Sequence, residues 1–197
     1  MSATKILASS RKDYVAALKQ CTNNVLAEVL TDTSSSSSSE QRYLDERSES
    51  AIALCDIIEL ILIHGMNIHA TSNDANSPTM STNVKIPLWE LLEHFEGVQY
   101  NYCIPLRNAV AAVASIPSLR TSWGKSRAFV RQLLNSMAIV SIFEYFTSPH
   151  VTKSKLVHFM YYPEAIVRYR EDAEMVLDIL RILKIVAFNF NLDRCDK

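Results

Sequence analysis

The stretch of sequence that decides the fold is Thr121-Ser-Trp-Gly-Lys-Ser-Arg-Ala-Phe-Val-Arg-Gln-Leu-Leu134. Ser122 suits the N-cap of a helix, because its hydroxyl oxygen can accept a hydrogen bond from a first-turn N–H group that lacks a partner inside the helix. Gly124 would weaken a helix interior by about 1 kcal/mol relative to Ala, so it belongs in the first turn or just before it. Apolar side chains then recur at spacings of three and four, which predicts a helix with one buried side: Phe129, Val130, Leu133, Leu134 and Met137.

The same helix carries cations away from its apolar side. Arg127 and Arg131 are four residues apart and are therefore neighbours on one helix face. Lys125 lies near the start of the helix. This pattern predicts a helix that is held in a core by one side and presents positive charge to a partner on another.

The run from Leu119 to Leu134 resembles the central motif of RUN domains, a Gly followed by basic residues and then by Arg-Ala-aromatic-aliphatic-Arg. Within that family it is most similar to adaptors in which a coiled coil and a FYVE finger follow the RUN domain. The resemblance covers roughly residues 9–193, because the flanking segments come in the same order. Two departures are Phe129, where many members have Trp, and Ser126, which replaces a common Gly.

The composition also favours a helical domain. The chain has 197 residues, of which 48% are hydrophobic, and it contains only 3 Gly and 6 Pro. A chain of this length suits one domain with a sizeable core, and the scarcity of Gly and Pro disfavours a turn-rich β fold. We therefore expect a single all-α, RUN-like domain over residues 1–197, a bundle of about eight helices with its core in residues 9–193.

Two polar segments interrupt the helical pattern. Residues 31–41 include six consecutive serines, which cannot bury enough surface to offset their ordering entropy, so we expect a flexible linker. A long loop rich in Ser, Thr and Asn is expected at residues 66–84. The apolar run between them contains Asp56 and Glu59 and is shorter than the roughly 20 residues of a membrane span, so it predicts a buried helix of a bundle.

The ends of two helices can be predicted as well. The second helix is expected to run from Tyr43 to His64, with Gly65 as its left-handed cap. A His-Gly or similar pair is common at this point of RUN domains. The last helix is expected from about Glu171 to Phe190.

Charge and motifs argue against several classes of function. The formal net charge is −1, so there is no bulk attraction to nucleic acid or anionic lipid. The chain has no phosphate-binding glycine loop, no dinucleotide fingerprint and no nucleophile elbow. Glu93-His94-Phe95-Glu96 fits no zinc-protease signature, and His64 and His69 lack a Cys or carboxylate at metal spacing. We expect no enzyme activity, no catalytic residue, no metal or other cofactor, no nucleic-acid partner and no direct membrane insertion.

The cysteines and the N-terminus bear on location. The 4 cysteines form no C-x-x-C pair, and reduced thiols are expected in a chain with such a core. Residues 1–8 lack the apolar core of a secretory signal. These features predict a cytoplasmic protein.

The resemblance implies an adaptor. RUN domains recognise small GTPases of the Rab, Rap and Arl types, usually in the GTP form. That role implies work in membrane traffic, organelle transport or autophagy, with recruitment to endosomal, lysosomal or autophagosomal membranes through partners. We expect Lys125, Arg127 and Arg131 to contact the GTPase, since guanidinium groups can pair with carboxylates in two-point contacts. His64 is added on the resemblance alone.

Two alternatives stay open. Arg127 can instead hold helix termini together inside the bundle. The whole domain can instead be a nucleotide-independent scaffold that docks a coiled coil, such as that of a kinesin or another motor subunit, in an apolar groove.

Overall fold

The computed structural model describes residues 10–33, 43–66, 88–94, 103–148 and 161–196. These residues are largely helical and contain no strand, which confirms the all-α prediction. The elements are α1 (Arg11–Thr33), α2 (Glu49–Ile63), α3 (Leu88–His94), α4 (Ile104–Ala114), α5 (Ser122–Asn135), α6 (Ile139–Thr147) and α9 (Arg170–Ile182), with the 3₁₀ turns η3 (Ile166–Arg168), η4 (Leu183–Ile185) and η5 (Leu192–Arg194).

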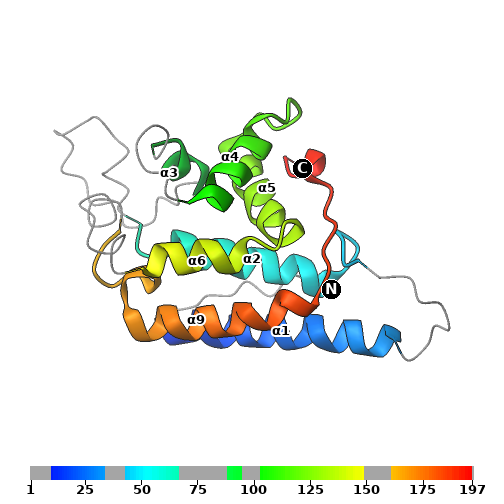
Figure 1. Cartoon of the computed structure of the whole chain (residues 1–197), viewed down its shortest axis with the longest axis horizontal. Helices are drawn as coiled ribbons and strands as arrows, with labels where there is room; N and C mark the ends of the chain where they lie inside the picture. Colours follow the sequence, from blue (N-terminus) through cyan, green and yellow to red (C-terminus); the bar gives the residue numbers. More distant parts are fainter. Residues whose placement is uncertain (1–9, 34–42, 67–87, 95–102, 149–160, 197) are drawn as a thin grey trace.

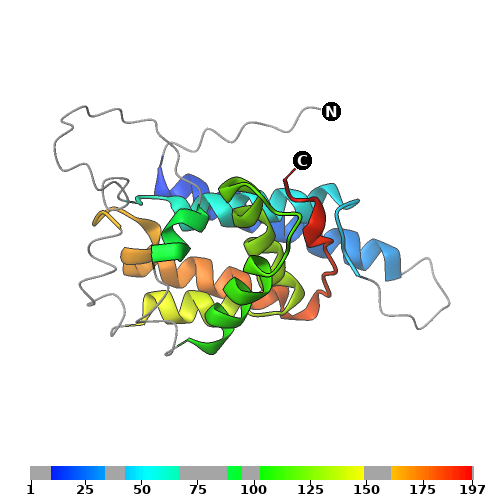
Figure 2. The same cartoon turned by 90° about the horizontal axis from the view of Figure 1, so that it is seen from above.

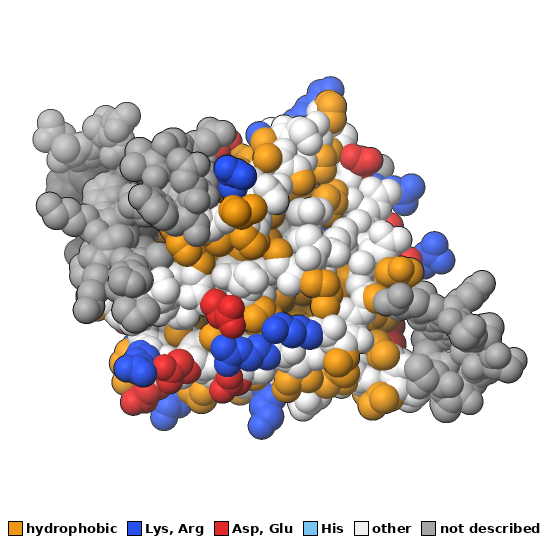
Figure 3. Space-filling model, in the orientation of Figure 1, with side chains coloured by type: hydrophobic (Ala, Val, Ile, Leu, Met, Phe, Trp, Pro, Cys, Tyr) orange, Lys and Arg blue, Asp and Glu red, His pale blue; other side chains and the backbone are white. Residues whose placement is uncertain are grey.

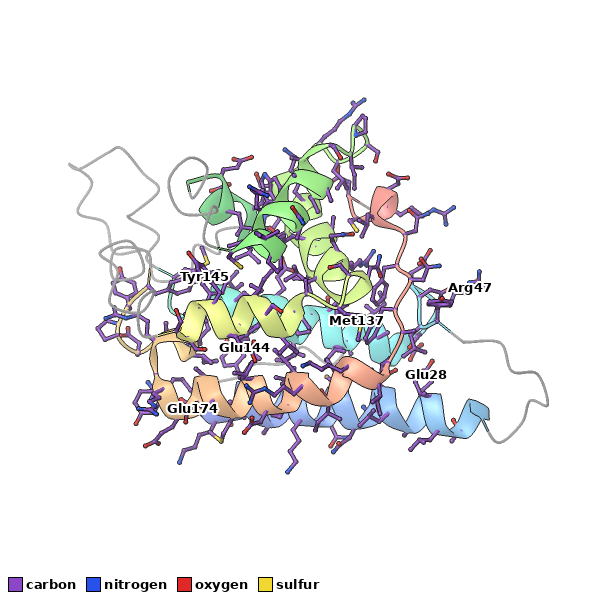
Figure 4. The ribbon with its side chains drawn as sticks, viewed as in Figure 1. Glu28, Arg47, Met137, Glu144, Tyr145 and Glu174 are labelled. Atoms are coloured by element: carbon purple, nitrogen blue, oxygen red, sulfur yellow. The ribbon has the colours of Figure 1, made fainter. Side chains whose placement is uncertain are left out.

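The helices are stacked in layers. Figure 1 shows α1 and α9 side by side along one edge of the molecule, α2 and α6 above them, and α3, α4 and α5 above these. Seen from above in Figure 2, α5 crosses over α2. Arg181 of α9 ties two layers together, because its Nη2 lies 3.1 Å from Oε1 of Glu144 on α6 (Figure 4).

The centre of the core is α2, as its apolar sequence predicts. It contacts α1, α3, α5 and η3. Ser48 caps it, with its hydroxyl oxygen accepting the Ala51 N–H at 3.0 Å. The buried side chains of α2 are Ala51, Leu54, Cys55, Ile57, Ile58, Ile61 and Leu62.

The prediction that this helix begins at Tyr43 is wrong. The Leu44 N–H donates to the Ala187 carbonyl and the Asn189 N–H donates to the Leu44 carbonyl, both at 2.9 Å. These bonds hold Leu44 in a bridge with the chain after α9, so its backbone is not available for a helix. The helix therefore starts only after Ser48.

The predicted cap at Gly65 is confirmed. Its φ of 70° lies in the left-handed region that favours Gly. A Cβ atom there would lie 2.6 Å from the Cα of Ala165, so the close approach of a second chain segment also requires Gly. The hydroxyl of the buried Tyr161 donates to the Leu62 carbonyl at 2.9 Å beside this turn.

The last helix ends earlier than predicted. It stops at Ile182, and after η4 the chain runs extended to Phe190. Asn135 holds the end of this segment, because its Oδ1 accepts the Phe190 N–H at 2.8 Å and its Nδ2 donates to the Phe190 carbonyl at 3.0 Å. Backbone pairing with Leu44 and these amide bonds replace the helical hydrogen bonds.

The first helix, α1, runs into the predicted linker. It continues to Thr33, so the first three residues of the predicted linker 31–41 are helical. Most of that linker and of the predicted loop 66–84 lies outside the described residues. An ion pair anchors α1, since Arg11 Nε lies 2.7 Å from Oδ2 of the buried Asp172 on α9. None of the helices in the described ranges is long and apolar enough to cross a bilayer.

Candidate functional site

The start of α5 is positioned by the end of the chain. Thr121, one residue before the predicted cap Ser122, is the N-cap and accepts the Gly124 N–H at 2.9 Å. The Asp196 carboxylate accepts the Thr121 hydroxyl and the Arg120 N–H, each at 2.5 Å. These hydrogen bonds, the Thr121 hydroxyl first, lower the pKa of Asp196. A Cβ on Gly124 would lie 1.6 Å from this carboxylate, so a larger residue there would displace the Asp196 side chain.

The two arginines of α5 lie beneath the same C-terminal segment. Arg127 is exposed, and its Nη1 donates to the Cys195 carbonyl at 3.3 Å. Arg131 is half-buried, with its Nη1 3.2 Å from the Cys195 sulfur and its guanidinium 5.7 Å from the centre of the Phe190 ring. Arg127 and Arg131 therefore lie on one face of α5, and their described hydrogen bonds go to uncharged atoms of Cys195.

Two carboxylates of α2, those of Asp56 and Glu59, interact electrostatically with this arginine pair. Burial raises the pKa of Glu59 to about 7, against the opposing effect of Arg127. Burial also raises the pKa of Asp56, again opposed by Arg127 and Arg131. Within the described part of the chain, no ion pair joins either carboxylate to these arginines, and the buried Oε1 of Glu59 has no hydrogen-bond partner. We call Asp56, Glu59, Arg127 and Arg131 the charge cluster.

Lys125 lies apart from the charge cluster. Two residues along a helix rotate a side chain by about 200°, so Lys125 and Arg127 point in nearly opposite directions. The Lys125 ammonium lies 3.9 Å from Oε1 of Glu93 and 5.3 Å from the centre of the Trp89 ring on α3. Its side chain is 26% exposed, so this cation is half-buried rather than fully presented.

His64 lies at the end of α2, apart from both the charge cluster and Lys125. It is the C-cap of α2, its Nδ1 accepts the Ile166 N–H at 3.2 Å, and its ring meets the edge of Tyr14 at 5.0 Å. Burial, and after it the charge of Arg11, lowers the pKa of His64. A neutral ring that accepts a backbone hydrogen bond serves the packing of α2 against η3. The structure thus brings Arg127 and Arg131 together and leaves Lys125 and His64 elsewhere.

A comparison of the sequence with models of protein families identifies the family of this helical domain. A model of the RUN domain matches residues 53–194, which is well over half of the chain. This protein belongs to the RUN domain family. The matched part of the RUN domain contains the whole charge cluster, whereas α1 precedes it and still packs against α2 and α9. RUN domains as a family are associated with small-GTPase interaction and with adaptor roles.

The match is to the family as a whole. It does not distinguish adaptors with a FYVE finger from other RUN proteins, so that finer resemblance stays a prediction. A search of curated proteins found no match to this RUN domain.

RUN domains as a family are interaction modules. Among the described residues, no group of three or more His, Cys, Asp or Glu side chains is placed to hold a metal ion. The four cysteines are buried and free. Burial raises the pKa of the Cys55 thiol to about 12, so it is not a thiolate near neutral pH.

Sequence reasoning missed the carboxylates of the cluster. In the sequence alone, Asp56 and Glu59 serve only as charges that argue against a membrane span. Their spacing of three residues places them on one face of an otherwise apolar helix. That pattern is a signal for opposing cations on a neighbouring helix, and it could have indicated that α2 faces Arg127 and Arg131.

Proposed function

We propose that this RUN domain is a non-enzymatic adaptor module that binds a small GTPase of the Rab, Arl or Rap type in its GTP-bound form. The observation that carries the proposal is the Arg127–Arg131 pair, held at the surface of α5 inside the matched region of the family. Family membership supports the class of partner.

The geometry of Arg127 suits recognition of a carboxylate. A guanidinium has several N–H donors in a planar fork, and the described bond from Arg127 to Cys195 uses one nitrogen. Its exposed side chain can therefore form a two-point contact with an acidic residue of the GTPase. Arg131 is half-buried and adds its positive charge to the same region.

We assign smaller roles to the other two predicted residues. Lys125 borders the start of α5 on another face, where it can contact only a partner that wraps around the helix. His64 is proposed to stabilise the fold and not to contact the GTPase, because its Nδ1 accepts a hydrogen bond from the Ile166 N–H. A partner contact by His64 would have to use the remainder of the half-buried ring.

We further propose that the GTPase connects this domain to membrane traffic, organelle transport or autophagy. In that proposal the domain is cytoplasmic and reaches endosomal, lysosomal or autophagosomal membranes through its partner. The support is the association of the family with adaptor roles.

The test is a binding screen that resolves the nucleotide state. A panel of Rab, Arl and Rap proteins would be loaded with GDP or with a non-hydrolysable GTP analogue and titrated with the purified RUN domain by calorimetry. The proposal predicts at least one GTPase that binds at least tenfold more tightly in the GTP form, which corresponds to about 1.4 kcal/mol. Failure of every GTPase in the panel to bind would contradict it.

The second candidate function is a scaffold that docks a coiled coil or a motor subunit, such as a kinesin, whatever the nucleotide. An apolar groove at the other end of α5 favours this candidate. Equal binding of the GDP and GTP forms in a pull-down with the motor subunit would support the scaffold over the effector.

A further inference from the structure

A groove opens on the face where α5 ends and α9 gives way to η4. It has a volume of about 240 Å³ and lies between the turn after α5, η4 and the extended segment that follows. Figure 4 labels Met137 at this place, and Figure 3 shows apolar side chains at the surface of the same face. Met137, Ile185 and Tyr43 line the groove, and Phe188 lines it from below. We call it the Met137 groove.

Large apolar side chains are exposed around the Met137 groove. Ile185 is 77% exposed, Tyr43 is 55% exposed and Met137 is 41% exposed, while Phe188 is buried. Single exposed apolar residues are ordinary, but several around one hollow mark an interaction surface.

The backbone of Met137 is a second, independent observation. Its φ of 56° is the only positive value at a non-glycine position among the described residues. The Ala138 N–H donates to the Leu133 carbonyl at 2.9 Å and the Met137 N–H donates to the Leu134 carbonyl at 3.1 Å. This is a Schellman motif with Met at the position where Gly is usual. A strained residue that exposes a large apolar side chain indicates a function for that side chain.

The charges of the groove restrict its occupant. Lys184 is exposed, and among the described residues that line the groove it is the one charged side chain, with no carboxylate beside it. Asn135 already uses its amide on the Phe190 backbone. The lining therefore complements a surface with apolar side chains and a carboxylate.

The backbone around the groove favours a helix over a strand as the occupant. Leu44 already pairs with Ala187 and Asn189, so that edge of the extended segment is closed to an added strand. The volume is also below the roughly 300–1,000 Å³ of small-molecule pockets, and it suits one or two inserted side chains. Met137 can adapt to such side chains, because its thioether is flexible and polarisable.

We propose that the Met137 groove docks an amphipathic helix of a partner protein. Leu, Ile or Phe side chains on one face of that helix lie beside Met137 and Ile185, and an acidic residue pairs with Lys184. This surface is separate from the Arg127–Arg131 pair and does not depend on GTPase binding, and the inference rests on the second candidate function, for which it names the docking surface and the charge of the docked helix.

The experiment uses a displayed library of three-turn helical peptides with Leu, Ile or Phe at i, i+3, i+4 and i+7. One arm carries Glu and Asp at the remaining positions and the other carries Lys and Arg. Each arm is selected against the 197-residue chain. We expect acidic peptides to be enriched at least tenfold over basic ones, and backbone amide shifts to map them to the residues around Met137.

Three variants and one control locate the binding. Ile185→Asp, Met137→Gly and Lys184→Glu should each weaken a selected acidic peptide at least tenfold. Ile182→Asp changes an exposed Ile of α9 outside the groove lining and should leave binding unchanged, as should Arg127→Glu. Ile185 is so exposed that its replacement should preserve the fold, which circular dichroism checks.

Three outcomes would overturn the proposal. The first is equal enrichment of basic peptides, and the second is binding that survives all three groove variants. The third is a dimer in sedimentation that Ile185→Asp dissociates, because the groove would then hold a second copy of this chain. Loss of GTPase binding with intact peptide binding would leave this proposal standing and would contradict the proposed function alone.

Discussion

His64 illustrates how a residue expected at an interface can act inside the fold. The ring accepts a backbone hydrogen bond through Nδ1 only while that nitrogen is unprotonated. Burial lowers the pKa of His64, so the unfolded chain binds a proton more readily than the folded one. Its contribution to stability is fully present above the unfolded pKa of about 6.5 and is lost as the pH falls toward the folded pKa.

A His64→Asn variant tests this role. Asn Oδ1 can accept the Ile166 N–H at every pH, so the variant should lose the part of the acid sensitivity that His64 supplies. Urea unfolding at pH 7.5 and pH 5.5 should show the wild type losing more stability than His64→Asn as the pH falls, with a difference of less than about 1 kcal/mol at pH 7.5. Identical losses in the two proteins would show that His64 does not titrate as proposed.

Glu59 has the opposite pH dependence. Burial raises its pKa to about 7, so the folded state binds a proton that the unfolded state releases near pH 4.5. The contribution of Glu59 to stability is present below pH 4.5 and is lost as the pH rises through 7. His64 and Glu59 therefore oppose each other below about pH 6.5, where His64 begins to take up a proton in the unfolded chain, and only variants can separate their contributions to stability.

A Glu59→Gln variant should be relatively more stable at high pH. Gln removes the buried charge and keeps the shape, so its advantage over wild type should be about 1–3 kcal/mol larger at pH 8 than at pH 5. Denaturant unfolding at the two pH values measures this. The same advantage at both pH values would mean that Glu59 does not hold a raised pKa in the folded domain.

At the scale of the element, α5 shows what a periodic pattern predicts and what it misses. Its first-turn Gly, its arginine pair and four residues of its apolar side were predictable from spacing, but the fifth, Met137, lies beyond the end of the helix and is 41% exposed. Its cap at Thr121 was not, because the choice between Thr121 and Ser122 depends on the Asp196 carboxylate far along the chain. The end of α9 was not predicted, because it depends on backbone pairing with Leu44, which is far away in the sequence. The alternating buried residues Val186, Phe188 and Phe190 are nevertheless typical of a strand-like segment.

The C-terminal turn of α5 allows a further prediction. A non-glycine residue in the left-handed region costs about 1–2 kcal/mol, so Met137→Gly should raise the unfolding free energy by about 0.5–1 kcal/mol after the entropy of the unfolded chain is counted. Thermal denaturation should show a higher Tm for the variant that is expected to lose peptide binding. A lower Tm would mean that Met137 contributes more through packing than its backbone costs.

At the scale of the whole molecule, the fold was more predictable than the site. Composition, helical periodicity and the RUN resemblance led to an all-α bundle, and the family match over residues 53–194 agrees. The four predicted contacts instead fall in three places, around Arg127 and Arg131, Lys125 and His64. Sequence spacing shows which residues share a helix face, but the packing of other elements decides which face is covered.

The helical bundle also includes α1, which precedes the region matched by the family model. The family match begins inside α2, yet α1 supplies Arg11 to the buried Asp172 of α9. Removing one partner of a partly buried ion pair leaves a charge without compensation. The N-terminal helix therefore packs into the same helical bundle as the matched region.

We propose that the exposed guanidinium of Arg127 docks the RUN domain onto a GTP-bound small GTPase. The measurement that tests it most directly is calorimetric titration of Arg127→Glu with the tightest GTPase of the panel. Arg107→Glu, which reverses an exposed charge on α4, serves as the matched control. The account predicts at least a tenfold weaker affinity for Arg127→Glu, an unchanged affinity for Arg107→Glu and unchanged circular dichroism for both. An unchanged affinity for Arg127→Glu would contradict the account.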